Sequence, residues 1–269
     1  MNSNLNRNLT DMQGNSKSKI FKIEKLDVEI SSTRQINGLA AANDVAKIMH
    51  KIIAEKNELR MIFAAAPSQN ELLSELIKVE NIDWTKVSAF HMDEYVGLKL
   101  DAPQSFGQFL KERIFNKVPF GKVNYIKTDE INLADACENY SKLLQEKPID
   151  IVCMGIGENG HIAFNDPPFA KFDDQVWVKA VLLDNVSRQQ QVNDGCFPQL
   201  EDVPKEAITL TIPALLSAKY LFVVVPGKSK AKAVKAALFG PIEEDCPASI
   251  LRNHNNAKLY LDKDSAANI

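Results

Sequence analysis

Segments typical of buried β-strands alternate with segments typical of amphipathic α-helices along most of this 269-residue chain. Short apolar runs occur at 59–65, 87–90, 123–126 and 149–154, and apolar residues at helical spacing occur at 38–55, 72–77, 106–115 and 134–144. This alternation predicts an α/β fold with an open, mostly parallel, doubly wound sheet and helices on both of its faces. We expect four more strands to complete the same sheet, at 176–183, 207–210, 220–225 and 258–261, with a helix at 229–238.

The length and the apolar content suit one domain. With 45% hydrophobic residues the chain can bury a full core, and no flexible linker divides it. Residues 1–18 are rich in Asn, Ser and Lys and poor in large apolar groups, so burial cannot offset the entropy of ordering them. We therefore predict a flexible N-terminal tail over 1–18 and a single domain over 19–269.

The charge balance favours a small-molecule ligand. The formal net charge is -3 and the pI is near 5.9, so no global basic field attracts nucleic acid or an anionic membrane. No apolar run approaches the ~18 residues of a membrane span, and we expect a cytoplasmic protein. The four cysteines lack C-x-x-C or zinc-ligand spacing, so we expect free thiols and no metal site.

Three glycines crowd into the segment that follows the apolar run 149–154. Gly155, Gly157 and Gly160 match the spacing of a dinucleotide-binding fingerprint. Such a site needs a helix that begins at the last glycine, and the paired Pro167 and Pro168 leave no room for a regular helix there. The glycines instead allow close approach of the backbone, whose amides can meet an oxyanion or a phosphate.

His161 follows these glycines and has Asn159 and Asp166 close by in the sequence. Polar neighbours of this kind set the tautomer and the basicity of an imidazole, which suits a general acid or base. A lone histidine is more often structural, but this one is expected at the carboxyl end of a strand, where ligands of doubly wound sheets bind. We predict that His161 is catalytic.

A second polar cluster closes the predicted strand 87–90. Asp93 and Glu94 are adjacent, so only one of the two carboxylates can point into a site at the sheet edge. A partly desolvated carboxylate there can remove a proton alpha to a carbonyl group. The alternative is a solvated pair of acids at a strand end.

Two turns and one polar segment complete the candidate residues. Lys230 lies in a strand-to-helix turn that either suits a phosphate or is an ordinary solvated helix start. Ser68 lies in a similar turn, where it either caps the helix or contacts phosphate. The polar segment 187–195, which ends in glycine, is a candidate lid that carries Arg188.

The motifs MDEYVGL at 92–98, GIGENGHIAFNDP at 155–167 and PGKSKA at 226–231 together resemble the glucosamine-6-phosphate deaminase (isomerase) family. The similarity runs from about residue 35 to about residue 262. It implies the deamination and aldose-to-ketose isomerisation of glucosamine 6-phosphate, or of its galacto epimer, without a metal or organic cofactor. The products would be ammonia and fructose 6-phosphate, or tagatose 6-phosphate from the galacto epimer.

The resemblance also assigns roles to single residues. Asp93 would shuttle the proton between C2 and C1 of the sugar, and His161 would open the ring with Asn159 and Asp166 as companions. Lys230 would hold the phosphate. The substrate-binding residues that we expect are Ser68, Glu94, Gly157, Gly160, Arg188 and Lys230.

The chain departs from the family pattern at four places. The glycine-rich phosphate turn is replaced by AAPSQ at 65–69, and Asp166 stands where the family has a longer glutamate. A second lid arginine is missing, which leaves Arg188 either to bind the phosphate or only to sit on the lid. The serine pair used for allosteric activation in some members is also absent, so we do not predict that activation.

Two other functions fit a fold of this kind. A 6-phosphogluconolactonase shares the fold and a Gly-His motif, but such enzymes typically carry Asp-Glu-Arg where this chain has Asp93, Glu94 and Tyr95. A non-catalytic sugar-phosphate sensor would need neither Asp93 nor His161. The sequence leaves open whether the protein forms a homo-oligomer.

Overall fold

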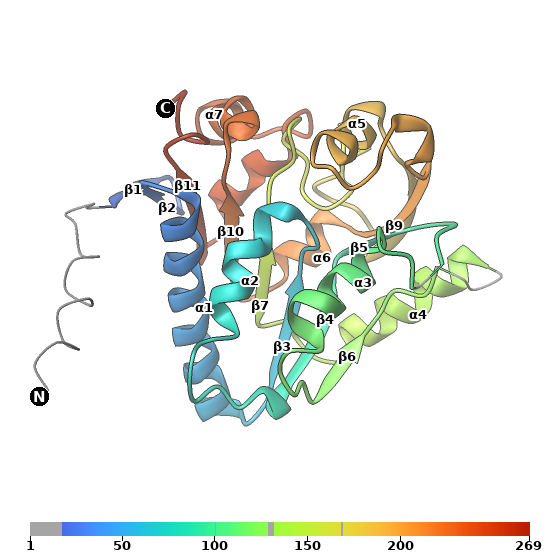
Figure 1. Ribbon diagram of the computed structural model, residues 1–269, viewed down its shortest axis with the longest axis horizontal. Coiled ribbons are helices and arrows are strands. Elements are labelled where there is room, and N and C mark those ends of the chain that lie inside the picture. Colours follow the sequence, from blue (N-terminus) through green and yellow to red (C-terminus); the bar gives the residue numbers. More distant parts are fainter. Residues whose placement is uncertain (1–17, 100, 129–131, 168) are drawn as a thin grey trace, which may run out of the picture.

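The computed structural model describes residues 18–99, 101–128, 132–167 and 169–269 as one α/β domain (Figure 1). An eight-stranded sheet has the order β1-β2-β11-β10-β7-β3-β4-β6, and all its neighbours are parallel except the β1–β2 hairpin. Its strands are β1 (Lys19–Ile23), β2 (Leu26–Ser31), β3 (Leu59–Phe63), β4 (Val87–His91), β6 (Lys122–Asn124), β7 (Ile151–Met154), β10 (Tyr220–Val225) and β11 (Ala257–Asp262). The mostly parallel sheet predicted from the sequence is confirmed. The expected tail, apart from residue 18, and Pro168 lie outside the described residues.

Helices cover both faces of this sheet, as predicted. The hydrophobic core on one face includes side chains of α1 (Arg34–Lys56), α2 (Asn70–Leu76) and α3 (Phe106–Leu110), which a π-helical turn continues to Phe115. The core on the other face includes α4 (Leu133–Gln145), α6 (Ile212–Leu216) and α7 (Ala231–Phe239). The remaining helix, α5 (Asn185–Asn193), lies within the segment predicted as a lid.

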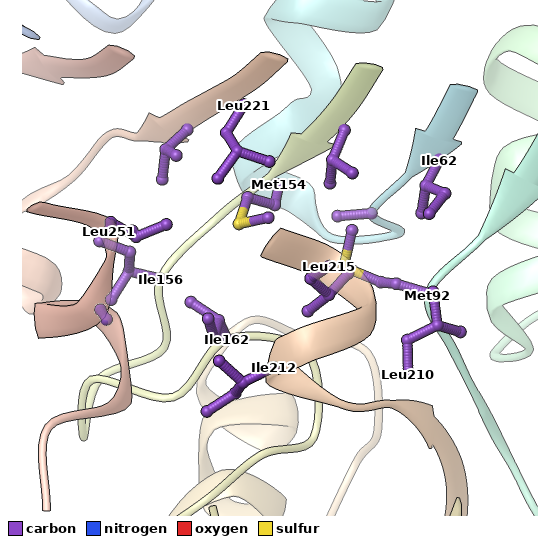
Figure 2. Close-up of a cluster of buried hydrophobic side chains, with 14 of the residues drawn as sticks. Ile62, Met92, Met154, Ile156, Ile162, Leu210, Ile212, Leu215, Leu221 and Leu251 are labelled. Atoms are coloured by element: carbon purple, nitrogen blue, oxygen red, sulfur yellow. The ribbon is translucent and has the colours of Figure 1, made fainter. Parts of the chain in front are cut away.

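Alternate residues of the central strands enter the two cores, because successive side chains of a strand point to opposite faces. Ile62 and Val152 pack on one face, whereas Met61 and Cys153 pack on the other. Figure 2 shows that Ile156 and Ile162, from the glycine-rich segment, enter the core that contains Ile62. The segment that carries the candidate histidine is therefore held in place by buried apolar side chains.

The prediction of one sheet was wrong in one respect. The segments expected at 176–183 and 207–210 form β8 (Val178–Leu182) and β9 (Glu206–Leu210), which pair antiparallel with each other and not with the large sheet. β9 also pairs with β5 (Asp93–Tyr95), a three-residue strand that was not predicted. β1 and β2 were missed as well. Strand pairing between segments distant in the sequence is decided by tertiary packing, which local periodicity does not report.

The strand order places the carboxyl ends of β3, β4, β7 and β10 side by side. From β3 the chain proceeds outward to β4 and β6, returns to β7 beside β3, and continues on the other side to β10 and β11. The strands that follow β3 in the chain are added on one side of it and those that follow β7 on the other, so the strand order reverses between these two parallel strands. Open α/β sheets bind ligands at such a point. The described residues contain no helix long and apolar enough to cross a membrane. The four cysteines are free.

Candidate active site

A cavity of about 180 Å³ lies at the carboxyl ends of these four strands. Residues that follow β3, β4, β7 and β10 directly line it, together with residues of α5 and the first residue of α1. Half of the ten predicted site residues line this cavity: Ser68, Asp93, Gly157, His161 and Lys230. Residues more than 150 positions apart in the sequence therefore share one small space.

Asp93 is the first residue of β5 and is only 7% exposed, yet it lines the cavity. No group among the described residues donates a hydrogen bond to its carboxylate. Burial, and secondarily the charge of Glu94, raise the pKa of Asp93 well above its ordinary value. The carboxylate is accordingly a stronger base than a solvated aspartate.

The backbone of Asp93 is held by His91, the last residue of β4. The backbone amide of Ile126 donates to His91 Nε2 at 2.8 Å, so the proton of the neutral ring is on Nδ1, which donates to the Asp93 carbonyl oxygen at 2.9 Å. Burial lowers the pKa of His91 to about 4, so the ring stays neutral at ordinary pH. A neutral histidine thereby fixes the position of the buried aspartate.

Glu94 does not reach the cavity, contrary to the prediction that it binds substrate. Its carboxylate accepts backbone hydrogen bonds from Tyr95 at 3.0 Å, Phe106 at 3.0 Å and Gly107 at 2.7 Å. The last two donors lie at the start of α3, so Glu94 satisfies amides that the helix itself leaves free. Because β5 alternates its side chains between two faces, the neighbour of Asp93 points away from the site.

His161 lines the cavity with one edge of its ring and meets three oxygen atoms with the other. Its Nδ1 lies 2.7 Å from Asn159 Oδ1, 2.9 Å from Asp166 Oδ1 and 2.9 Å from Ser187 Oγ. Asn159 Nδ2 also donates to Asp166 Oδ1 at 2.9 Å. The structure therefore brings together the histidine and both of its predicted companions, with Ser187 as an additional neighbour.

The Asp166 carboxylate is almost completely buried behind this histidine. Burial alone would raise its pKa, but the charge of His161 and the hydrogen bonds from His161, Asn159 and Ser187 outweigh it and lower the pKa of Asp166. The group is thus held as a carboxylate against His161. The shorter side chain expected from the sequence still reaches the imidazole.

The glycines of the loop provide room for the histidine, and Gly155 and Gly157 line the cavity. A Cβ atom at Gly157 would collide with the ring of His161, so only glycine lets the imidazole lie against the backbone. Gly160 has a φ of 86° and packs against the Cys246 sulfur, outside the lining of the cavity. The prediction that Gly160 contacts substrate therefore finds no support in its position, and no helix begins in the loop.

A buried lysine also lines the cavity. Lys230, at the start of α7, is only 5% exposed and lines the cavity with Ser68 and Gly227. Burial lowers the pKa of Lys230, and the carboxylates of Asp194 and Glu158 oppose this effect. The Gly227 amide donates to the Asp262 carboxylate.

Arg34 is a second cation in the lining of the cavity, and the sequence did not indicate it. It is the first residue of α1 and lines the cavity. Its Nε and Nη2 donate to both oxygens of Glu71 at 2.7 and 2.9 Å, and Nη2 also donates to the carbonyl oxygen of Pro67. Glu71 raises the pKa of Arg34, which keeps the guanidinium charged. Its position more than 30 residues before the altered turn gave no local signal.

Arg188 is excluded from the cavity, and its expected contact with phosphate is not supported. The guanidinium donates to Asn185 Oδ1 and to the carbonyl oxygens of Leu200 and Val203. Arg188 therefore fastens α5 to the segment that follows it. Of the two alternatives left open by the sequence, the structure favours an arginine that only sits on the lid.

The face of α5 toward the cavity is polar. Ser187, Gln190 and Gln191, which are buried, and the half-buried Asp194 at the end of the helix are spaced at i, i+3, i+4 and i+7, which places them on one side of the helix. The last three line the cavity, and Gln190 Oε1 accepts a hydrogen bond from the Glu158 amide at 2.9 Å. A polar stripe at helical spacing was visible in the sequence, although its burial was not.

Comparisons with known proteins agree with this geometry. A model of the family described as glucosamine-6-phosphate isomerases/6-phosphogluconolactonase matches residues 33–261. A glucosamine-6-phosphate deaminase of Listeria monocytogenes is 35% identical over 234 residues, which cover 86% of this chain and 96% of the relative. One from Streptococcus suis is 34% identical over 236 residues, covering 87% of this chain and 96% of the relative.

Two solved structures share the fold. A monomeric glucosamine-6-phosphate deaminase superposes with a TM-score of 0.83 at 29% identity and covers 90% of this chain and 99% of its own. A 6-phosphogluconolactonase from Trypanosoma brucei superposes with a TM-score of 0.74 at 19% identity, covering 93% of this chain and 100% of its own. At that identity the likeness concerns the fold alone. The cavity at the switch point, the family match and the curated relatives agree: this chain belongs to the family of glucosamine-6-phosphate isomerases and 6-phosphogluconolactonases.

Proposed function

We propose that this chain isomerises and deaminates an amino-sugar 6-phosphate. The reaction would convert glucosamine 6-phosphate and water to fructose 6-phosphate and ammonia, or galactosamine 6-phosphate to tagatose 6-phosphate and ammonia. The observation that carries the proposal is that Asp93 and His161 line one small cavity whose lining also holds Lys230 and Arg34. The deaminase names of relatives at 34–35% identity support the same reading.

His161 is proposed to open the pyranose ring. Its Nδ1 is occupied by Asn159, Asp166 and Ser187, whereas no described residue forms a hydrogen bond with Nε2. Nε2 is thus available to move a proton between the anomeric hydroxyl group and the ring oxygen. The buried Asp166 carboxylate stabilises the ring when it carries the second proton.

Asp93 is proposed to move the carbon-bound proton. It takes the proton from C2 of the open-chain aldehyde, the electron pair of that bond forms the C1–C2 double bond, and the C1 carbonyl oxygen takes up a proton from solvent to give an enolamine. The same carboxyl group returns its proton to C1, and the nitrogen lone pair forms the double bond of a protonated ketimine at C2. Water adds to this carbon and ammonia leaves, so the atoms balance without an added oxidant or reductant.

Lys230 and Arg34 are proposed to hold the phosphate. The lysine stands at the start of α7, where the helix dipole also favours an anion. Glu71 and Pro67 occupy Nε and Nη2 of Arg34, so Nη1 is the guanidinium nitrogen that can reach a ligand. Ser68 would add a hydroxyl donor from the altered turn at 65–69.

The test is an ammonia-release assay on the purified chain with both epimers. Release from either epimer, together with loss of deuterium from C2 of a C2-deuterated substrate, is the expected outcome. Isomerisation breaks the bond between C2 and its hydrogen, whereas hydrolysis does not, so loss of this label separates the two reactions. Absence of ammonia from both substrates would reject the proposal, and so would full activity of Asp93→Asn.

Hydrolysis of 6-phosphogluconolactone is the second candidate, because the family includes lactonases and because lactonase structures share the fold. A buried base and a phosphate-binding end suit that reaction as well. Lactone hydrolysis should therefore be measured beside ammonia release, and rapid hydrolysis without ammonia would favour the lactonase. A cytoplasmic location and a homo-oligomeric state stay predictions.

A further inference from the structure

Ser187 is the only residue of α5 whose side chain forms a hydrogen bond with His161 among the described residues. It lies in the first turn of the helix, and its side chain is completely buried. Its hydroxyl group donates to Asp166 Oδ1 and lies 2.9 Å from His161 Nδ1. One lid hydroxyl therefore bridges the histidine and the carboxylate behind it.

The hydrogen-bond directions in this cluster are fixed by the donors that are available. The Asn159 amide nitrogen points to Asp166, so its oxygen faces His161, and this oxygen also accepts the His161 backbone amide at 3.1 Å. The single hydroxyl proton of Ser187 is donated to Asp166, so the Ser187 oxygen can only accept a hydrogen bond from the imidazole ring. All three neighbours of Nδ1 are acceptors, and Nδ1 must carry the proton.

This tautomer leaves Nε2 without a proton in the neutral ring. Nε2 is the nitrogen on the cavity side, because the three partners of Nδ1 do not line the cavity. The same helix that supplies Ser187 also supplies Gln190 and Gln191 to the cavity wall. Movement of α5 would therefore change the wall of the site and the contacts of its histidine together.

We propose that Ser187 is a positioning residue: its hydroxyl group couples the position of α5 to the hydrogen bonding and orientation of the His161 ring. The hydroxyl acts through the imidazole and does not touch substrate. Part of the inference rests on the proposed function, since the effect on turnover requires that His161 opens the sugar ring. The effect on the imidazole itself is independent of any substrate.

The first experiment observes the ring directly. The chain has four histidines, so NMR of protein labelled with ¹⁵N at histidine gives four ring systems, and His161→Gln identifies the one of interest. In the wild-type protein the Nδ1 proton should be present and slow to exchange. In Ser187→Ala this proton should shift upfield and exchange faster, because one of its three acceptors is gone.

The matched control is Val186→Ala, which shortens an exposed side chain in the same helical turn. It should leave the His161 resonances at their wild-type positions. Arg188→Gln is the second variant: it loosens the far side of α5 without touching His161, and it should shift the Nδ1 proton in the same direction as Ser187→Ala. Unchanged His161 resonances in Ser187→Ala, or equal shifts in Val186→Ala, would overturn the proposal.

The second experiment measures turnover of the amino-sugar phosphate. Ser187→Ala should lower kcat by about tenfold to a hundredfold, because the hydrogen bonds of Ser187 to His161 and to the charged Asp166 are lost. KM should stay within about twofold, because the residues proposed to bind the phosphate are unchanged. Ser187→Thr keeps the hydroxyl group and should recover most of kcat. A kcat within twofold of wild type in Ser187→Ala contradicts the inference. If the NMR shifts appear but the wild-type chain deaminates neither epimer, the proposed function fails and the positioning role stands.

Discussion

Asp93 and Glu94 are adjacent in the chain, but their carboxylates serve opposite sides of β5: Asp93 lines the cavity, and Glu94 accepts the amides that begin α3. Pairing of Asp93 with Thr209 of β9 fixes which of the two faces the cavity. One acid is left without a hydrogen-bond donor among the described residues, and the other accepts three. The two carboxylates should therefore respond oppositely to neutralisation.

Asp93→Asn should abolish most activity and stabilise the fold. Loss of a general base typically costs 10²- to 10⁴-fold in rate, so kcat for ammonia release should fall by roughly that factor. The amide carries no charge, so the energetic penalty of burying a carboxylate disappears and Tm at neutral pH should rise.

Glu94→Gln is the matched comparison, because it neutralises the neighbouring acid. Its Tm should fall, since one of the two acceptor oxygens is replaced by a donor that faces the amides of α3. Thermal melting of both variants checks the pair. A lower Tm in Asp93→Asn would contradict the structure.

The pH dependence follows from the raised pKa of Asp93. Only the carboxylate can accept the C2 proton, so kcat/KM should rise as the pH increases through that pKa. Stability runs the other way. The unfolded chain loses this proton near the ordinary value of 3.8, whereas the folded chain retains it to higher pH, so the free energy of unfolding falls across that window and stays lower above it.

Paired profiles of kcat/KM and of Tm against pH test this expectation. The charge of Glu94 contributes to the raised pKa of Asp93. Glu94→Gln should therefore move the rise of kcat/KM on the acidic side of the profile, its acidic limb, to lower pH. Asp93→Asn should lose the corresponding step in the Tm profile. An acidic limb that does not move in Glu94→Gln would show that another group governs it.

The two lysines of the turn before α7 provide a test of the phosphate end. Lys230 is buried and lines the cavity, whereas Lys228, two residues earlier, is exposed and does not. Lys230→Ala should raise KM by about tenfold to a hundredfold, which is the typical loss for a hydrogen bond to a charged group. Lys228→Ala removes the same charge from the same turn and should change KM by less than about twofold at moderate ionic strength. Equal effects in the two variants would indicate a general electrostatic role.

Arg34 should be the second determinant of KM. Arg34→Ala should raise KM for the sugar phosphate by roughly tenfold or more with a smaller change in kcat, because the residue is proposed to bind the phosphate and not to transfer protons. Arg34→Lys keeps the charge but loses the two-point contact with Glu71, so its KM should be intermediate.

Arg188→Ala tests whether the two arginines have different roles. The hydrogen bonds of the Arg188 guanidinium go to Asn185, Leu200 and Val203 and hold α5 in place. The substitution should lower Tm and kcat before it affects phosphate affinity. Inorganic phosphate, measured as a competitive inhibitor, reports that affinity separately. Weaker inhibition by phosphate in Arg188→Ala than in Arg34→Ala would contradict the assignment.

Much of the fold could be predicted because its strands are short apolar runs that repeat between amphipathic helices. The strands at 59–63, 87–91 and 151–154 and the helices around 34–56 and 133–145 were recognised from this periodicity. β5 was missed because three residues with two acids carry no apolar alternation. The separate β5-β9-β8 sheet was missed because local sequence does not report which strand a segment pairs with.

The sequence by itself determined the chemical groups of the site: a histidine with an amide and a carboxylate close by, a pair of acids after a strand, and a lysine at a helix start. Only the tertiary structure decided which of these groups meet. It directed Asp93 and Glu94 to opposite sides of β5 and kept Arg188 out of the cavity. It also brought Arg34 into the cavity lining and Ser187 against His161. The physical reason is that a site at a sheet edge is assembled from strand ends and helix starts far apart in the chain, whose proximity depends on strand order and packing.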